Sequence, residues 1–201
     1  MLSNFQLVVE YNKIKLGAES SSDTRYRELK SEFIKSTLNK PFIRKARAGD
    51  EASIHHAHMR SIKEICVKDH GRDEIKGWGF RELGDRWIEA VQTEFVKVIE
   101  FNRNIYGVSC YRTLTSDAGD KYGYIHALYL TAEVIGLGLA KKMMIEMLEE
   151  ARANQVKFIK LDSSITAYKF YKSFGFEDDG PKRKVEIGGY PVTCYPMIYS
   201  V

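Results

Sequence analysis

The alternation of hydrophobic and polar positions is clearest between residues 122 and 150. Residues 122–130 alternate with the two-residue period of a β-strand, and apolar residues within 143–151 recur at the three- and four-residue spacing of a helix. Gly136 and Gly138 stand between these segments, where residues without a Cβ atom let the chain turn sharply. The pattern therefore predicts a strand, a tight glycine turn and a helix.

The segments from residue 42 onward extend this pattern into a mixed order of strands and helices. Asp50 could cap the first helix, and Gly77, Gly79 and Gly84 are expected to break a second helical region. The predicted order is β-α-α-β-β-β-α-β-α-β-β, in which antiparallel hairpins flank a single βαβ unit. We expect an α/β fold of the α+β kind, with helices against a mixed sheet. The remaining expected strands are 42–46, 95–101, 105–114 and 156–162, the helices 51–66, 141–150 and 165–174, and the final hairpin 182–199. The second helical region follows a loop at 68–72 and contains Trp78, Phe80 and Trp87.

Residues 1–40 differ in pattern from the rest of the chain and are expected to form an extension to a domain of residues 41–201. Hydrophobic residues alternate across 5–16 with one slip of phase, which predicts a strand pair or a bulged strand. The polar residues 20–23 could then cap a helix over 26–33. This extension could be an oligomerisation arm, as in a homodimer, or a lid, or a packed decoration.

The composition indicates a single soluble domain. A chain of 201 residues with 44% hydrophobic residues can bury one sizeable core. Its 31 basic and 27 acidic residues give a charge of +4, too mild and too evenly spread to indicate nucleic-acid binding. The longest apolar region is too polar to span a membrane, and the first residues lack the pattern of a signal peptide. We expect a cytoplasmic protein that binds neither nucleic acid nor membranes.

The cysteines and histidines do not predict a metal site. Cys66, Cys110 and Cys194 are widely spaced and form neither a disulfide framework nor a CxxC pair, which suits a reducing compartment. One of them could be a nucleophile, although a free cysteine more often packs as a small hydrophobe. His55 and His58 are one helical turn apart, but no nearby ligand completes a tetrahedral set. His58 could instead line a pocket.

The glycine turn before the central helix is a candidate phosphate site. Unpaired N–H groups and the positive end of the helix dipole lie at such a helix start. Gly136-Leu137-Gly138 also begins a dinucleotide-binding fingerprint. Asp162, at the end of the next predicted strand, stands where that fingerprint has the acidic residue that binds ribose. Lys141 occupies the third glycine position, however, and only one βαβ unit is predicted. These two observations argue against a dinucleotide fold.

Two stretches around this turn resemble a known family. IHALYLTAEVIGLGLAKKMM at 125–144, followed by LDSSITAYKFYKSFGF at 161–176, is similar to the acyl-coenzyme A binding core of the GNAT-type (GCN5-related) N-acetyltransferases. The resemblance runs from about Phe42 to the C-terminus. It implies the GNAT fold, with a mostly antiparallel sheet around a central βαβ unit. It also implies acetyl-coenzyme A as co-substrate, without a metal.

The resemblance further implies which residues bind coenzyme A. In the family an Arg/Gln-x-x-Gly-x-Gly/Ala turn wraps the pyrophosphate, and Ile135 departs here from its first position, which removes one side-chain contact. The family's Asn-x-x-Ala-x-x-Phe-Tyr motif here begins with the shorter Ser164. Pantetheine is expected to pair with strand backbone, whose hydrogen bonds an amide can complete. The implied residues are Leu128, Tyr129, Leu130, Ile135, Gly136, Leu137, Gly138, Leu139, Ala140, Lys141, Ser164, Ala167 and Phe170.

The resemblance implies catalytic roles for Tyr171 and His126. A phenol is protonated at neutral pH, so Tyr171 could protonate the departing thiolate. Alternatively, it is a tyrosine packed beside Phe170 and Phe174. Related enzymes often place a carboxylate or histidine base on the strand before the turn, and His126 is expected on the same face as Tyr124, where many relatives carry a glutamate. A packed His126 or the lack of a dedicated base are the alternatives.

The resulting hypothesis is an acetyl-coenzyme A dependent N-acetyltransferase that acts by direct attack of a primary amine. The acceptor is a small molecule or a peptide of unknown identity. Relatives build acceptor pockets from the helical region that contains Trp78 and Trp87. The departures at Ile135, Ser164 and Tyr124 favour an alternative, a non-catalytic GNAT-fold sensor or adaptor that binds acyl-coenzyme A.

Overall fold

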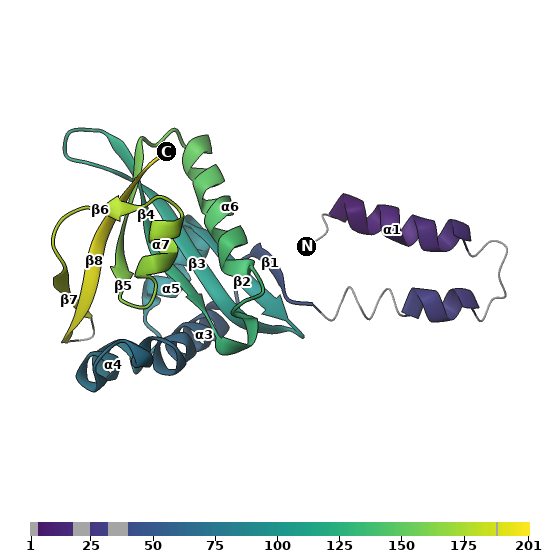
Figure 1. Ribbon diagram of the computed structural model, residues 1–201, viewed down its shortest axis with the longest axis horizontal. Helices are drawn as coiled ribbons and strands as arrows, with labels where there is room; N and C mark the ends of the chain where they lie inside the picture. Colours follow the sequence, from purple (N-terminus) through teal and green to yellow (C-terminus); the bar gives the residue numbers. More distant parts are fainter. Residues whose placement is uncertain (1–3, 18–24, 32–39, 188) are drawn as a thin grey trace. The chain divides into compact units, whose positions relative to one another are not determined.

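The computed structural model describes residues 4–17, 25–31, 40–187 and 189–201 (Figure 1). The chain divides into two compact units, Met1–Phe42 and Ile43–Val201, and each is described by itself.

The N-terminal unit is helical. Helix α1 spans Asn4–Gly17 and a second helix spans 25–31, with the Tyr11 and Tyr26 hydroxyl groups 3.4 Å apart. The predicted strand over 5–16 is therefore wrong. Its apolar positions also satisfy the i, i+4, i+7 spacing of a helix, and alternation over so few residues does not separate the two periods. The predicted cap at 20–23 lies outside the described residues.

The second unit is built on one sheet in the order β1-β2-β3-β4-β5-β8-β6, with β7 paired to β8. Strands β4 and β5 are parallel, whereas the pairs β2–β3, β3–β4, β5–β8, β6–β8 and β7–β8 are antiparallel. The expected mixed sheet is thus confirmed. The strands are β1 Phe42–Lys45, β2 Phe95–Phe101, β3 Asn104–Thr115, β4 Lys121–Leu130, β5 Phe158–Ser164, β6 Glu177–Asp178, β7 Arg183–Ile187 and β8 Tyr190–Ser200.

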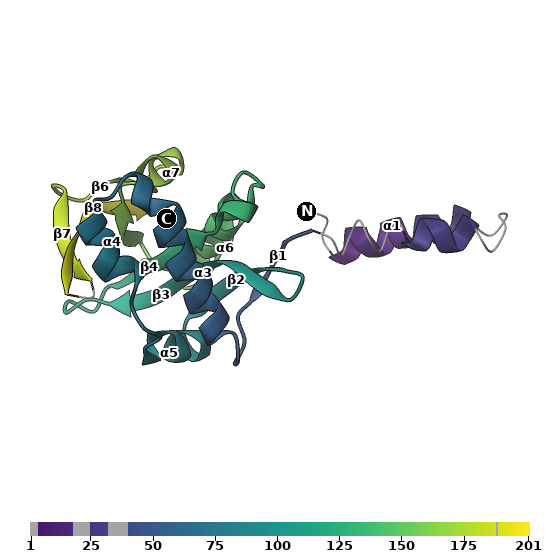
Figure 2. The same cartoon turned by 90° about the horizontal axis from the view of Figure 1, so that it is seen from below.

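Helices cover both faces of the sheet (Figures 1 and 2). On one face, α3, α4 and α5 bury side chains such as Ile54 and Trp78 against the strands. On the other face, α6 and α7 bury Met144, Met147 and Tyr171 with the strand residues Ile125 and Leu161. The helices are α3 Glu51–Glu64, α4 Arg72–Gly79, α5 Asp85–Thr93, α6 Leu139–Ala153 and α7 Tyr168–Ser173, with 3₁₀ turns η1 Cys66–Lys68 and η2 Ala132–Val134.

Two local expectations about helix α3 and helix α4 differ from the structure. Asp50 does precede α3, but its carboxylate binds the Arg44 guanidinium and the Arg47 N–H instead of capping the helix. Gly77 does not break its helix. It lies inside α4, where a Cβ atom would come within 2.2 Å of the Tyr190 ring, so glycine is needed there for close packing rather than for a turn.

The central feature of the sheet is the early separation of β4 from β5. They pair only at Gly123 with Ile159 and at Tyr124 with Lys160. Just beyond this point the β3–β4 register shifts, so that His126 is an extra residue and forms a β-bulge. Bulges bend a strand and increase its twist. The facing edges of β4 and β5 are therefore left open beyond the bulge.

The short β4–β5 pairing depends on Gly123. A Cβ atom there would lie 2.6 Å from the Tyr111 ring and 3.1 Å from Ile159. Gly123→Ala is therefore expected to lower the free energy of unfolding by about 1–3 kcal/mol, the usual cost of overpacking, measured by urea denaturation. Gly71→Ala is the matched control because a Cβ atom there meets no other atom within 4 Å. Equal stabilities of the two variants would contradict this account.

Candidate functional site

Three adjoining cavities follow the opened edge of β4 in the part of the chain that the structure describes. The turn cavity, about 550 Å³, lies between the end of β4, the glycine turn and α7. The strand slot, about 30 Å³, lies between β4 and β5. The aromatic cavity, about 470 Å³, lies between β4 and helices α3 to α5. Tyr129 lines all three, so they meet at one residue.

The turn cavity has the features of an anion site. Gly136 and Gly138 adopt φ of +81° and +74°, and nothing lies within 4 Å of a Cβ atom at either position. Helix α6 then begins at Leu139 without a side-chain cap, so its first N–H groups remain available. Lys141 adds a positive charge to the lining. Backbone donors, the helix dipole and a lysine together suit a phosphate group.

Most residues predicted to bind the cofactor line this cavity. Leu137 is the exception: its side chain is 55% exposed and is not part of the lining. Sequence reasoning missed Ser61, Cys66 and Thr166, which come from α3, η1 and the turn before α7. The lining residues that were predicted are Leu128, Tyr129, Leu130, Ile135, Gly136, Gly138, Leu139, Ala140, Lys141, Ser164, Ala167 and Phe170.

The strand slot contains one candidate acid, Tyr171. This tyrosine is 5% exposed, lies on α7 and lines the slot together with Ser164 and Ala167. Burial raises the pKa of its phenol, so the hydroxyl group stays protonated at neutral pH. The Ser164 hydroxyl accepts a hydrogen bond from the Ala167 N–H at 3.2 Å. The serine therefore holds the turn that leads into α7.

His126 and Tyr124 lie on the same face of β4, with their ring centroids 4.6 Å apart. The Tyr124 hydroxyl donates to Asp162 at 2.8 Å, and Asp162 also binds the Arg183 guanidinium. The Nε2 atom of His126 is buried and has no partner among the described residues. Burial, followed by the charges of Arg112 and Arg86, lowers the pKa of His126 to about 4. This imidazole is therefore neutral at physiological pH.

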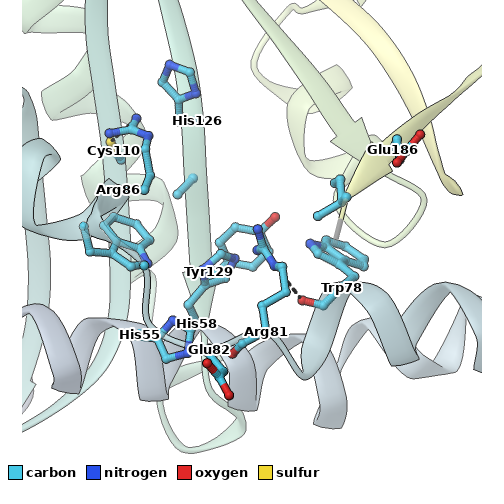
Figure 3. Close-up of a pocket in the computed structure, with 14 residues that line it drawn as sticks. His55, His58, Trp78, Arg81, Glu82, Arg86, Cys110, His126, Tyr129 and Glu186 are labelled. Atoms are coloured by element: carbon cyan, nitrogen blue, oxygen red, sulfur yellow. Dashed lines mark hydrogen bonds between the residues drawn. The ribbon is translucent and has the colours of Figure 1, made fainter. Parts of the chain in front are cut away.

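The wall of the aromatic cavity is formed by ring side chains (Figure 3). His58 lies with its ring centroid 4.2 Å from that of Tyr129 and 5.6 Å, edge-on, from that of Trp87. Trp78 packs edge-on against Tyr129 from the other side, at 6.2 Å. Neither nitrogen of His58 has a hydrogen-bond partner among the described residues, and burial lowers its pKa to about 3. His58 lines this cavity as a neutral ring.

Glu94 contacts two arginines and a cysteine at one end of the aromatic cavity. Its carboxylate binds Arg86 at 2.9 Å, lies 3.7 Å from Arg112 and accepts a hydrogen bond from the Cys110 thiol at 2.8 Å. Burial and this hydrogen bond raise the pKa of Cys110. Because a thiol must ionise to attack, Cys110 is poorly suited to act as a nucleophile.

A hydrogen-bonded histidine connects the helices of one face to the turn before α7. His70 binds Glu74 through Nδ1 at 2.7 Å, and its Nε2 accepts the Ile165 N–H at 3.2 Å. Glu74 in turn accepts a hydrogen bond from Thr193 at 2.7 Å. These bonds join segments up to 119 residues apart, and no local sequence pattern signals them. They fix one wall of the turn cavity, because Ile165 lies between Ser164 and Thr166.

The opened β4–β5 pair, the glycine turn before α6 and the adjoining cavities define an acetyltransferase fold. The chain belongs to the GNAT acetyltransferase family: the model of the acetyltransferase (GNAT) domain matches residues 66–196. A search of curated proteins gives no match. No helix in the described part of the chain is both long and apolar enough to cross a membrane.

Several solved structures share the fold. A GCN5-related N-acetyltransferase from Rhodopseudomonas palustris is 16% identical with a TM-score of 0.68, over 82% of this chain and 98% of that one. The PaiA N-acetyltransferase from Thermoplasma acidophilum, solved with coenzyme A, is 13% identical with a TM-score of 0.62, over 81% and 99%. Arabidopsis thaliana Naa50, solved with a bisubstrate analogue, is 21% identical with a TM-score of 0.58, over 80% and 99%.

The lowered pKa of His58 predicts a loss of stability in acid. Above pH ~6.5 the histidine is neutral in both the folded and the unfolded chain. As the pH falls toward the folded-state pKa of about 3, only the unfolded chain takes up the proton, so stability falls by up to about 1.4 kcal/mol per pH unit. His58→Phe keeps a ring between Trp87 and Tyr129 and should reduce this slope by one proton in urea titrations at pH 4 to 6.5. An unchanged slope would contradict the burial of a neutral histidine.

Proposed function

We propose that the chain is an N-acetyltransferase that moves an acetyl group from acetyl-coenzyme A directly to a primary amine, with residues 41–201 as the catalytic domain. The observation that carries this proposal is the position of Tyr129, which lines all three cavities. Ligands in the turn cavity and the aromatic cavity would therefore meet at the strand slot. Direct transfer needs such an arrangement, because the reacting atoms must approach to about 3–3.5 Å.

The turn cavity and the strand slot would bind coenzyme A. The open backbone around Gly136 and Gly138 and the start of α6 suit a pyrophosphate. The open edges of β4 and β5 suit the amides of pantetheine, which can complete their backbone hydrogen bonds. Two relatives were solved with coenzyme A or an analogue that contains it, which supports this assignment. Leu137 would contribute only its backbone, because its side chain is outside the lining.

Tyr171 is the proposed acid. In the reaction the amine nitrogen attacks the acetyl carbonyl carbon, the carbon–sulfur bond breaks, and the amine loses a proton while coenzyme A leaves as a thiol. Burial keeps the phenol protonated. The thiolate that forms as the carbon–sulfur bond breaks would accept this proton from Tyr171.

His126 would orient the acceptor amine. Its neutral ring can accept a hydrogen bond from the amine through Nε2, which has no partner among the described residues. Its pKa of about 4 and the nearby charges of Arg86 and Arg112 make it a weak proton acceptor. The amine would therefore release its proton to water, with His126 holding the nitrogen in place.

Thioester cleavage in the presence of an amine panel tests the proposal. The panel contains small amines, amino acids and peptides, and release of free thiol is measured together with the mass of the acetylated product. The proposal requires thiol release that depends on one class of amine. Thermal stabilisation by coenzyme A without any thiol release would identify the alternative, a binding protein.

Replacement of the proposed acid should slow turnover without weakening cofactor binding. Tyr171→Phe removes only the hydroxyl group, so kcat should fall by ~10²–10⁴, the range of general-acid contributions, while coenzyme A still stabilises the protein. Tyr168→Phe is the matched control on the same helix, because its hydroxyl group donates to Asp178 and not into the slot. A Tyr171→Phe enzyme with the turnover of the control would remove the acid from the mechanism.

Ile135 stands where the family has arginine or glutamine, and this difference allows a gain-of-function test of the turn cavity. Ile135 lines the turn cavity and is 49% exposed, so an arginine can be accommodated there without disturbing the core. Ile135→Arg should tighten coenzyme A binding by roughly tenfold or more, since a hydrogen bond to a charged group contributes about 1.5–3 kcal/mol. Leu137→Arg, two residues away and outside the lining, should have a smaller effect. Calorimetry compares the two, and equal affinities would show that the pyrophosphate binds elsewhere.

A further inference from the structure

The aromatic cavity contains an arginine without a carboxylate partner. Arg81 follows helix α4 and lines the cavity. Figure 3 shows its side chain extending alongside Tyr129, with the Nε–H donating to the Trp78 carbonyl oxygen at 3.2 Å. Partial burial lowers the pKa of this guanidinium group, although the residue as a whole is exposed. None of the ion pairs among the described residues includes Arg81.

The other charged groups of the cavity do not compensate Arg81. Arg86 already shares the Glu94 carboxylate with Arg112. Glu82 points away from the Arg81 guanidinium in Figure 3, and Glu186 is an exposed residue on β7. These two carboxylates make no ion pair with Arg81.

Two histidines of the cavity lining, His58 and His126, carry no positive charge near neutral pH. His58 and His126 are neutral because their pKa values are lowered to about 3 and about 4. His55 is occupied by a hydrogen bond to the Arg81 carbonyl oxygen at 2.9 Å. Of the two arginines that line the cavity, Arg81 is the one that makes no ion pair with any residue the structure describes.

We propose that the acceptor is an amino acid or a similar small amine that carries a carboxylate, and that Arg81 binds this carboxylate. The inference rests on the proposed function, because it names the substrate class of the same site. Of the Arg81 guanidinium group, only the Nε–H donates a hydrogen bond to a residue that the structure describes, so the rest of the group can bind a ligand in the cavity, and its planar fork matches a carboxylate. One carboxylate balances one arginine, whereas a phosphate monoester would bring ~1.5–2 negative charges.

The dimensions and walls of the cavity agree with a small acceptor. Its volume of about 470 Å³ lies at the small-molecule end of ligand pockets. Trp78, Trp87 and Tyr129 offer apolar surface for a side chain, while Arg81 and His126 lie on either side of Tyr129 along the cavity (Figure 3). A carboxylate at Arg81 would direct the amine toward His126 and the strand slot.

Arg81 would also favour the reactive form of the amine. A nearby cation disfavours an ammonium ion and so lowers its pKa, which increases the fraction of neutral amine at physiological pH. Arg86 and Arg112, close to His126, act in the same direction. The ligand's carboxylate would provide binding energy through its contact with Arg81.

The test compares amino acids with their carboxamides and with the corresponding decarboxylated amines. Initial rates of thiol release give kcat/KM for each acceptor with the intact protein and with Arg81→Met, Arg81→Lys and Arg72→Met. Arg72 begins helix α4, which precedes Arg81, and lies outside the cavity lining, so its variant is the control. Each variant is first checked for stabilisation by coenzyme A, which reports an intact fold and cofactor site.

The expected result is a preference for the carboxylate over the amide of roughly tenfold to a hundredfold, from a charge-assisted contact of about 1.5–3 kcal/mol. Arg81→Met should abolish the preference, Arg81→Lys should retain part of it, and Arg72→Met should leave it unchanged. A protein that prefers the amides or the decarboxylated amines, or an Arg81→Met variant that keeps the preference, would overturn the inference while the acetyltransferase proposal stands.

A second measurement separates the two proposals if no amine is acetylated. That outcome would defeat the proposed function, and the thermal stability of the coenzyme A complex with each ligand then decides the inference. Stabilisation by amino acids but not by their amides, lost in Arg81→Met, would support a carboxylate site. Equal shifts for amino acids and amides would overturn it.

Discussion

The site depends on the short length over which two parallel strands pair. Strands β4 and β5 are held together at Gly123–Ile159 and Tyr124–Lys160, and the His126 bulge then turns β4 away. Every open backbone group on the facing edges must find a partner, because buried N–H and C=O groups rarely remain unpaired. The opening therefore creates both a space and a set of hydrogen-bonding groups for a ligand. The cavities at Tyr129 are a direct consequence of this geometry.

The elements around the opening stabilise it from both faces. Helix α6 packs Met143, Met144 and Met147 beneath the sheet, and α3 covers the opposite face. The hydrogen bonds of His70 with Glu74 and with the Ile165 backbone connect α4 to the end of β5. A gap in a sheet would otherwise be free to close or widen. Residues outside β4 and β5, distant from them in the sequence, therefore hold the opening in place.

The sequence predicted those parts of the fold that follow from local periodicity. The strand, glycine turn and helix over residues 122–150 are strongly patterned, and the hairpin around Asn102 carries turn residues whose positive φ is observed. The N-terminal helix was missed because its short apolar pattern satisfies both periods. Gly77 was misjudged, since close packing against Tyr190 is a tertiary property that a glycine in a sequence does not reveal.

The candidate site was predictable where it consists of backbone and of matched motifs, and not where it consists of side chains brought together by the fold. The glycine turn and Tyr171 lie within such motifs. Arg81 and the partners of Glu94 do not, because contacts between side chains on different elements depend on how the fold brings those elements together. The low pKa of His126 likewise arises from burial and from arginines on other elements.

The position of Tyr129 also has a thermodynamic consequence. This residue forms part of the wall of all three cavities, and its ring contacts His58 and Trp78. Any ligand that shifts this ring changes the free energy of the neighbouring cavity as well. By linkage, the two sites must then alter each other's affinity by the same factor, whichever is filled first. A preferred order of binding can therefore arise from a single shared aromatic residue, without any movement of the sheet.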